Sequence, residues 1–241
     1  MTGRHDISVT LPWLREGTTH LLSQVAKLTD DEFRTPSLLP GWTRGHVIAH
    51  VARNAEALGR LVDWARTGVE SRMYSSAGQR ADEIARTAAE AAPILRQDAA
   101  STAQALDHSL AQLSDEQWHR QIRSALGRVI PAAEVPWLRI REVWLHAVDI
   151  DTGATVHDIP ADIIDLLLDD VTTTLSAKPG CPCLVLAPTD RERAWALGGA
   201  GQHAGPHPAV RVPAATTAGW LTGRPAFNDL PISLPPLPAW L

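Results

Sequence analysis

A helical repeat of apolar residues runs through the first two thirds of this 241-residue chain. Between about residues 11 and 28, apolar side chains recur every three or four positions, which is the spacing of one face of an α-helix. Further helical segments are expected over 43–67, 77–113 and 136–151. Four long helices with modest connections favour an antiparallel four-helix bundle.

Residues with strong positional preferences mark the ends of these segments. Thr43 can cap the second helix, and Gly68 can end it. Pro93 lies inside the third segment and is expected to kink or divide it, whereas Pro136 suits the first turn of the fourth helix. The less regular segment 119–135 is interpreted as a small hairpin or an extended loop.

The pattern changes after Asp158. A helix is expected over 159–177 with Asp158 as its cap, and a last helix over 214–221. Short β-like runs punctuated by Pro and Gly lie between them, at 183–186, 194–197 and 209–212. The Pro-rich tail, 231–241, is expected to be extended chain. These features predict an α+β protein with two parts, a bundle domain over 1–154 and a smaller α/β domain over 155–241.

Composition excludes several classes of function. The formal net charge is −5, and the chain lacks the clustered basic face of a nucleic-acid-binding domain. No apolar run approaches the roughly 20 residues needed to span a bilayer, and the N-terminus lacks the apolar core of a signal peptide. We therefore expect a soluble, cytoplasmic protein that binds neither nucleic acid nor membrane.

The two cysteines, Cys181 and Cys183, are separated by one residue, so a disulfide between them would be strained. Their scarcity fits a reducing compartment. The Cys-Pro-Cys run is interpreted as two small apolar residues entering a strand, in preference to a metal or redox motif.

Two of the expected helices carry titratable residues among apolar neighbours. His46 and His50 are four residues apart on the second helix, as are Glu142 and His146 on the fourth, so each pair shares a helix face. A buried carboxylate is costly unless it is paired or metal-bound, and zinc favours imidazole nitrogen and carboxylate oxygen. This pattern predicts a divalent metal site but leaves open which of His46 and His50 points inward. The alternative is a set of hydrogen-bonded histidines at a helix interface.

Three sequence motifs resemble those of a known family. Pro40-Gly41-Trp42-Thr43, followed by His46 to His50, is similar to the second-helix signature of the DinB-like metal-binding bundles. Residues 141–149 resemble the fourth-helix signature in the form used by mycothiol-dependent maleylpyruvate isomerases. Residues 220–224, Trp-Leu-Thr-Gly-Arg, resemble a turn of the C-terminal α/β domain of that family.

The resemblance implies a specific set of site residues. The metal ligands would be His50, Glu142 and His146, which makes His46 the less favoured histidine. Asp149 matches the Asp of the family's His-x-x-Asp motif and would orient a ligand or handle a proton. From the residues alone, a solvated Asp in the last helical turn is an equal alternative.

The resemblance also implies an activity, the cis–trans isomerisation of maleylpyruvate to fumarylpyruvate, with mycothiol and zinc or another divalent metal as cofactors. Addition of a thiolate converts the double bond to a single bond, which rotates before elimination restores the alkene. Arginine suits the carboxylates of such a substrate. Arg224 is the first candidate, for both catalysis and cofactor binding, and Arg141 is the second. The alternative for Arg224 is a surface arginine at a helix C-terminus. Arg141 points about 100° away from Glu142 on its helix, which favours a role outside the site.

Other functions remain open at this stage. One is a mycothiol S-transferase that conjugates other electrophiles, and another is a non-catalytic metal- or thiol-sensing protein. A third is a metal-free bundle in which Glu142 is solvent-exposed or forms an ion pair, for example with Arg53 or Arg139. Metal identity, the residues that dock mycothiol and the oligomeric state are not determined by the sequence.

Overall fold

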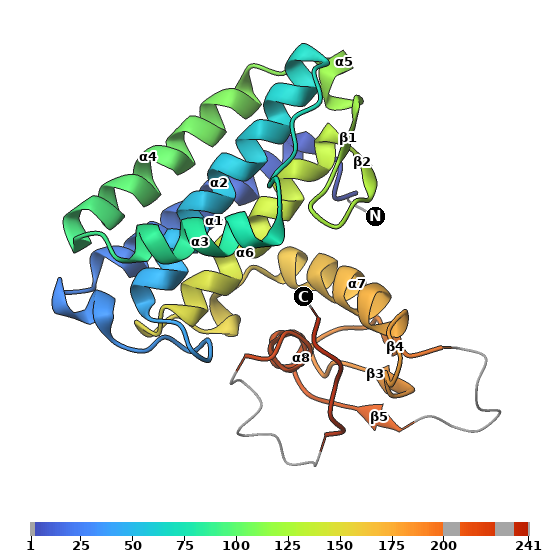
Figure 1. The fold of residues 1–241 in the computed structure, drawn as a ribbon. Helices are drawn as coiled ribbons and strands as arrows, with labels where there is room; N and C mark the ends of the chain where they lie inside the picture. The colour runs from blue at the N-terminus through green and yellow to red at the C-terminus, as the bar shows by residue number, and fades with distance from the viewer. Residues whose placement is uncertain (1–2, 200–207, 225–233, 241) are drawn as a thin grey trace. The chain divides into compact units, whose positions relative to one another are not determined.

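The computed structural model describes residues 3–199, 208–224 and 234–240. The chain forms two compact units, Met1–Ala154 and Thr155–Leu241 (Figure 1). The first is helical apart from a small hairpin, and the second combines helices with a short sheet. The predicted α+β fold class is confirmed.

Four long helices build the first unit: α1 (Ile7–Ala26), α2 (Arg44–Thr67), α4 (Ala92–Ala111) and α6 (Val135–Asp149). Helix α2 packs against α4 and α6, and α1 packs against α6 (Figure 1). The predicted segment 77–113 is two helices, because α3 (Ala77–Ala88) ends before α4 begins. Pro93 lies in the first turn of α4, where its missing N–H costs no hydrogen bond. Helix α3 packs on α2 as an addition to the bundle.

The expected signals at the ends of α2 are confirmed. The Thr43 side chain accepts a hydrogen bond from the His46 backbone, and Gly68 ends the helix in the left-handed conformation with φ of 79°. The irregular segment contains the antiparallel hairpin β1 (Gln121–Arg123) and β2 (Val129–Pro131). Shorter helical turns complete the unit, namely η1 (Asp31–Arg34), α5 (Asp115–Trp118) and η2 (Ala132–Glu134).

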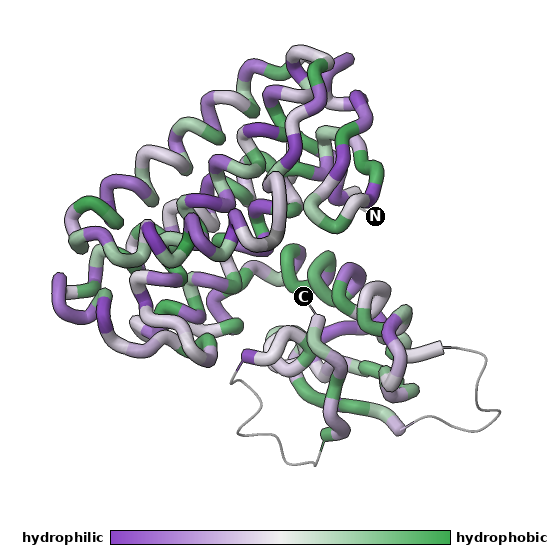
Figure 2. Tube along the Cα trace, in the orientation of Figure 1, coloured by the Kyte–Doolittle hydropathy of each residue, from purple (hydrophilic) through white to green (hydrophobic). Residues whose placement is uncertain are grey.

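Helices α1 and α6 approach each other closely at Gly17. A Cβ atom at this position would lie 2.6 Å from Trp144 Nε1 and 2.7 Å from Val143 Cγ2, so no larger residue fits without displacement. Hydrophobic and hydrophilic positions alternate around the bundle helices (Figure 2), as expected where one face of each helix is buried. The close approach at Gly17 fixes α6, which carries Glu142, against α1.

The second unit contains helices α7 (Ala161–Ser176) and α8 (Ala214–Leu221) and the strands β3 (Leu184–Leu186), β4 (Trp195–Leu197) and β5 (Ala209–Val210). Strand β3 lies between β4, which is antiparallel to it, and β5, which is parallel. The prediction of Asp158 as the cap of α7 is wrong. Asp158 instead closes a capping box with Thr155 in the turn η3 (Val156–Asp158), and α7 begins after Pro160.

Part of the predicted extended tail, residues 231–233 and 241, lies outside the described residues. Residues 234–240 have no regular secondary structure. The carbonyl of Trp240 accepts a hydrogen bond of 2.7 Å from Lys178 Nζ, and the Trp240 side chain is buried. The end of the tail is therefore packed on its own unit.

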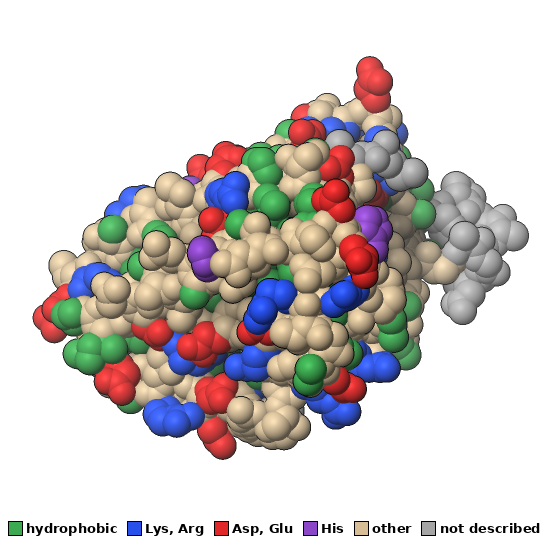
Figure 3. Space-filling view, turned by 90° about the horizontal axis from the view of Figure 1, so that it is seen from above, with side chains coloured by type: hydrophobic (Ala, Val, Ile, Leu, Met, Phe, Trp, Pro, Cys, Tyr) green, Lys and Arg blue, Asp and Glu red, His purple; other side chains and the backbone are tan. Residues whose placement is uncertain are grey.

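The surface shows no single dominant charge on the face drawn in Figure 3, where basic and acidic side chains are intermingled. Within the described residues, the helices are all too short or too polar to cross a membrane.

Candidate metal centre

Two helices of the bundle bring three potential metal ligands together. His50 comes from α2, and Glu142 and His146 come from α6. Glu142 Oε2 lies 2.9 Å from His50 Nε2 and 3.2 Å from His146 Nε2, and one ligand atom of each residue lies within 4.8 Å of the others. The two imidazole rings meet edge to face, with centroids 4.7 Å apart. Within the described parts of the chain, this is the one group of three or more His, Cys, Asp or Glu side chains arranged in this way.

The structure separates the roles of the two histidines on α2. His46 Nδ1 lies 2.7 Å from the Thr43 hydroxyl and 3.3 Å from the Thr43 backbone nitrogen. His46 therefore completes the cap of α2, whereas His50, one turn later, is buried and faces Glu142. Spacing alone left open which of the two histidines points inward. Because His46 caps α2, the inward residue is His50.

Hydrogen bonding within the cluster determines the charge of each member. Burial would raise the pKa of Glu142, but the hydrogen bonds to His146 and His50 outweigh it and hold the pKa well below its usual value. Burial lowers the pKa of His50 despite the nearby Glu142. At His146, burial is outweighed by hydrogen bonds to Asp149 and Glu142, so its pKa is raised. The cluster thus holds a carboxylate and, at His50, an imidazole that favours its neutral form.

Asp149 orients His146. Its Oδ2 lies 2.8 Å from His146 Nδ1, and the Asp149 side chain is 1% exposed, so the alternative of a solvated Asp is wrong. The bond fixes the proton of neutral His146 on Nδ1 and leaves Nε2 directed toward Glu142. The Asp149 carbonyl also accepts a hydrogen bond of 3.0 Å from the Leu38 backbone, which ties the loop before α2 to the end of α6.

The Pro-Gly-Trp segment shapes one wall of the cluster. Gly41 adopts φ of 78°, which an L-residue rarely does, and the following Trp42 places its ring 5.6 Å from that of His50 in an edge-on arrangement. The motif that suggested the family from sequence therefore contributes an aromatic contact to a residue of the cluster.

The proposed ion pair between Glu142 and Arg53 or Arg139 does not account for the cluster. Arg53 pairs with Glu56 on its own helix and with Asp98 on α4. Arg139 donates from Nη1 to Asn54 Oδ1 and to the Val51 carbonyl, each at 2.8 Å. Burial lowers the pKa of Arg139 to about 10, so it stays cationic at neutral pH and supports α2 next to His50.

Sequence reasoning missed Arg80 and Tyr74. Arg80, on α3, places Nη2 3.3 Å from His50 Nδ1, and its guanidinium carbon lies 5.9 Å from the centre of the Tyr74 ring. Thirty residues separate Arg80 from His50, and no spacing rule links them. The one available signal was that Tyr74 is the sole tyrosine of the chain.

The remaining predicted residues lie in different surroundings. Arg141 precedes Glu142 on α6 and is half-buried. Arg224 belongs to the second unit, is 9% exposed and donates from Nη1 to the Thr222 carbonyl at 2.7 Å. The alternative of Arg224 as a surface residue is therefore wrong, and its role toward a ligand stays a prediction. Cys181 and Cys183 are free thiols in the second unit.

The donor set fits a divalent metal. Ligand atoms of a tetrahedral zinc site with bonds near 2.0–2.1 Å lie about 3.3 Å apart, and the two contacts to Glu142 Oε2 are close to this value. The side chains of Glu142 and His146 keep exposures of 19% and 12%, so the cluster is accessible from solvent. Three protein ligands with access for a fourth is the arrangement of catalytic zinc sites.

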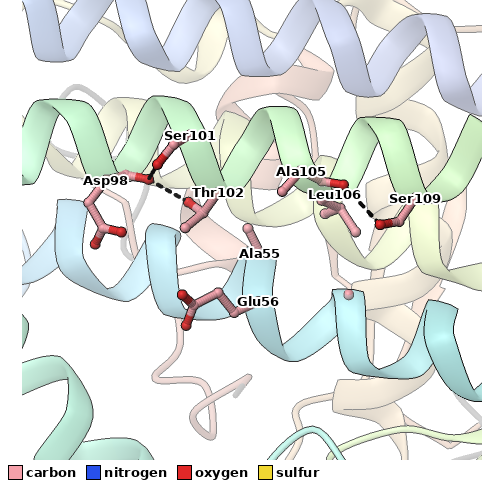
Figure 4. Close-up of a pocket in the computed structure, with 9 residues that line it drawn as sticks. Ala55, Glu56, Asp98, Ser101, Thr102, Ala105, Leu106 and Ser109 are labelled. Carbon is pink, nitrogen blue, oxygen red and sulfur yellow. Dashed lines mark hydrogen bonds between the residues drawn. The ribbon is translucent and has the colours of Figure 1, made fainter.

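A hollow on another face of α2 lacks such a set of metal ligands. It has a volume of about 380 Å³ and lies between α2 and α4, lined mostly by small side chains together with Glu56, Asp98 and Leu106 (Figure 4). The hydroxyls of Ser101 and Thr102 donate to the Asp98 carbonyl of their own helix, and the Asp98 carboxylate pairs with Arg53. Its polar groups are thus already satisfied, and we place the candidate site at His50, Glu142 and His146.

A helical bundle that gathers two histidines and a glutamate from two of its helices defines the class of metal-binding helical-bundle proteins. The sequence model of the mycothiol maleylpyruvate isomerase N-terminal domain matches residues 14–151. The chain belongs to the mycothiol-dependent maleylpyruvate isomerase family, and is therefore an isomerase.

Two solved structures support this membership. The crystal structure of a mycothiol-dependent maleylpyruvate isomerase is 34% identical in sequence and superposes with a TM-score of 0.91, with all of both chains covered. A histidine-to-alanine mutant of a protein with the same name gives 33% identity and the same TM-score and coverage. No curated protein sequence matches the chain.

Proposed function

We propose that the protein converts maleylpyruvate to fumarylpyruvate by reversible addition of the mycothiol thiolate at a zinc centre. The observation that carries this proposal is the convergence of His50, Glu142 and His146 within 4.8 Å. Zinc bound there would lower the pKa of a coordinated thiol and polarise a substrate oxygen. Family membership supports the same reaction, since the solved relatives are named for it.

Each residue of the cluster has a distinct task in this proposal. Glu142 supplies an anionic oxygen that stays ionised because two histidines bond to it. His50 and His146 supply the nitrogen ligands, and Asp149 holds His146 in the tautomer that presents Nε2. Trp42 packs edge-on against His50 and restricts its ring.

The second unit supplies the predicted cation. We propose that Arg224 contributes to substrate or mycothiol binding, as the Trp-Leu-Thr-Gly-Arg motif implies. Its guanidinium is already oriented by the Thr222 carbonyl, and Gly223, with φ of 75°, allows the chain to turn after α8. Arg224→Lys would retain the charge but lose the fork geometry suited to a carboxylate.

The experiment combines metal analysis with a thiol balance. Purified protein should contain about one equivalent of zinc per chain, and His50→Ala should contain much less. With maleylpyruvate and catalytic mycothiol, the wild type should form fumarylpyruvate while the concentration of free mycothiol returns to its starting value.

Two outcomes would contradict the proposal. Stoichiometric loss of mycothiol with a conjugated product would assign the protein as a mycothiol S-transferase. Full activity in a zinc-free His50→Ala protein would show that the cluster is not the site of the reaction.

A further inference from the structure

Arg80 differs from most other arginines of the first unit in its partner. Arg15, Arg44, Arg53 and Arg96 each form an ion pair with a carboxylate. Arg80 forms no ion pair with any residue that the structure describes, and its polar partners are His50 Nδ1, 3.3 Å from Nη2, and the Tyr74 side chain, with which it forms a hydrogen bond. A guanidinium carries five N–H donors, which is more than the contacts with His50 and Tyr74 use, so donors remain for another group.

The position of Arg80 is fixed by aromatic packing. Its guanidinium carbon lies 5.9 Å from the centre of the Tyr74 ring, within the range of a cation–π contact. Arg60 approaches the same ring at 6.0 Å and donates from Nε to the Met73 carbonyl at 3.0 Å. Tyr74 and the loop that carries it are therefore anchored to α2, which holds the Arg80 cation beside the His50 ring.

The contact between Arg80 and His50 depends on the tautomer of His50. With Nε2 donating to Glu142, Nδ1 accepts from Arg80, and both hydrogen bonds are satisfied. A metal on Nε2 requires the proton of neutral His50 to lie on Nδ1. Nδ1 and Arg80 Nη2 would then both be donors, so the hydrogen bond between them would be lost and this N–H of the guanidinium would be available to an acceptor next to the centre.

We infer that Arg80 binds a carboxylate of the substrate beside the metal centre. This inference rests on the proposed function, which supplies a dicarboxylate substrate. Arginine offers two parallel N–H donors to a carboxylate and stays charged at every physiological pH. The same contact would hold the acid close to His50 while the double bond is isomerised.

The test uses maleate, a cis-dicarboxylate, as a probe of zinc-loaded protein. In Arg80→Met, calorimetry should show maleate binding weakened by about 10- to 100-fold, because a charge-assisted pair is lost. The KM for maleylpyruvate should rise in parallel, while zinc content and the KM for mycothiol stay near the wild-type values. Arg80→Lys should recover part of the affinity. Arg86→Met, which removes an exposed arginine of the same helix, is the matched control and should bind maleate like the wild type.

Unchanged maleate affinity in zinc-loaded Arg80→Met would overturn the inference, whether or not the enzyme turns over. Loss of zinc from Arg80→Met, with normal maleate affinity once zinc is restored, would also overturn it by showing that Arg80 only positions His50. If the wild type bound maleate through Arg80 but did not isomerise maleylpyruvate, the proposed reaction would fail and the carboxylate site would stand.

Discussion

Helix α2 has two contrasting interfaces. Toward α6 it buries His50 against Glu142 and His146, and toward α4 it packs small residues around a hollow (Figure 4). Burying ionisable groups costs free energy unless each has a partner or a metal. The α4 side has satisfied its polar groups within the two helices, whereas the α6 side holds a ligand set that matches a metal. The hollow is therefore a poorer guide to function than the cluster of donors.

The strongest test of this contrast removes a ligand. His50→Ala should lose zinc and reduce isomerase activity by at least about 10³-fold, because metal stabilisation of the transition state is worth several kcal/mol. Glu56→Gln, on the α4 side of the same helix, should keep both zinc and activity. Elemental analysis measures zinc, and a steady-state assay measures activity, in both variants. Equal losses of zinc and activity in the two variants would show that the two interfaces of α2 do not differ in function.

Asp149→Asn should weaken zinc binding by about 10- to 100-fold, because the variant loses the carboxylate that orients His146. Chelator competition measures the dissociation constant. Asp98→Asn, which alters the carboxylate paired with Arg53 between α2 and α4, should leave zinc affinity unchanged. Wild-type affinity in Asp149→Asn would mean that Asp149 does not support the site.

Acidification should weaken zinc binding through His146. Its pKa is raised above 6.5, because hydrogen bonds to Asp149 and Glu142 outweigh burial, and a protonated imidazole cannot bind metal. The loss should therefore begin at a higher pH than the pKa of an ordinary histidine would give, and in Asp149→Asn it should begin at lower pH. In the metal-free protein, the stabilisation from protonated His146 is present below its unfolded pKa and is lost as the pH rises through the folded pKa. NMR titration of the imidazoles tests this, and a His146 that titrates below its ordinary value would contradict it.

Two Gly→Ala changes give the smallest expected effects. Gly17→Ala should destabilise the fold by about 1–3 kcal/mol through overpacking, since its Cβ would lie 2.6 Å from Trp144 Nε1. Gly59→Ala, in α2 beside the hollow, meets nothing within 4 Å and should stabilise the fold by about 0.5–1 kcal/mol. Thermal or urea unfolding measures the change in the free energy of unfolding for both variants, and the two changes should have opposite signs. A stabilised Gly17→Ala would show that α1 and α6 do not pack closely at this position.

Spacing along the chain was enough to predict which residues share a helix face. Spacing placed Glu142 and His146 together, Thr43 and Gly68 marked the ends of α2, and Pro93 marked the break between α3 and α4. These features depend on neighbours within a few residues, for which backbone geometry and capping chemistry suffice. The family motifs added the expected ligand set.

Only the tertiary structure decided which faces meet. It brought His50 to Glu142 across 92 residues of sequence, assigned His46 to the cap, buried Asp149 and set Arg80 beside His50. Helical periodicity fixes the direction of a side chain about its own axis, but the packing of different helices depends on side-chain fit between distant segments. For that reason the ligand pattern was visible in the sequence, whereas the cation beside it was not.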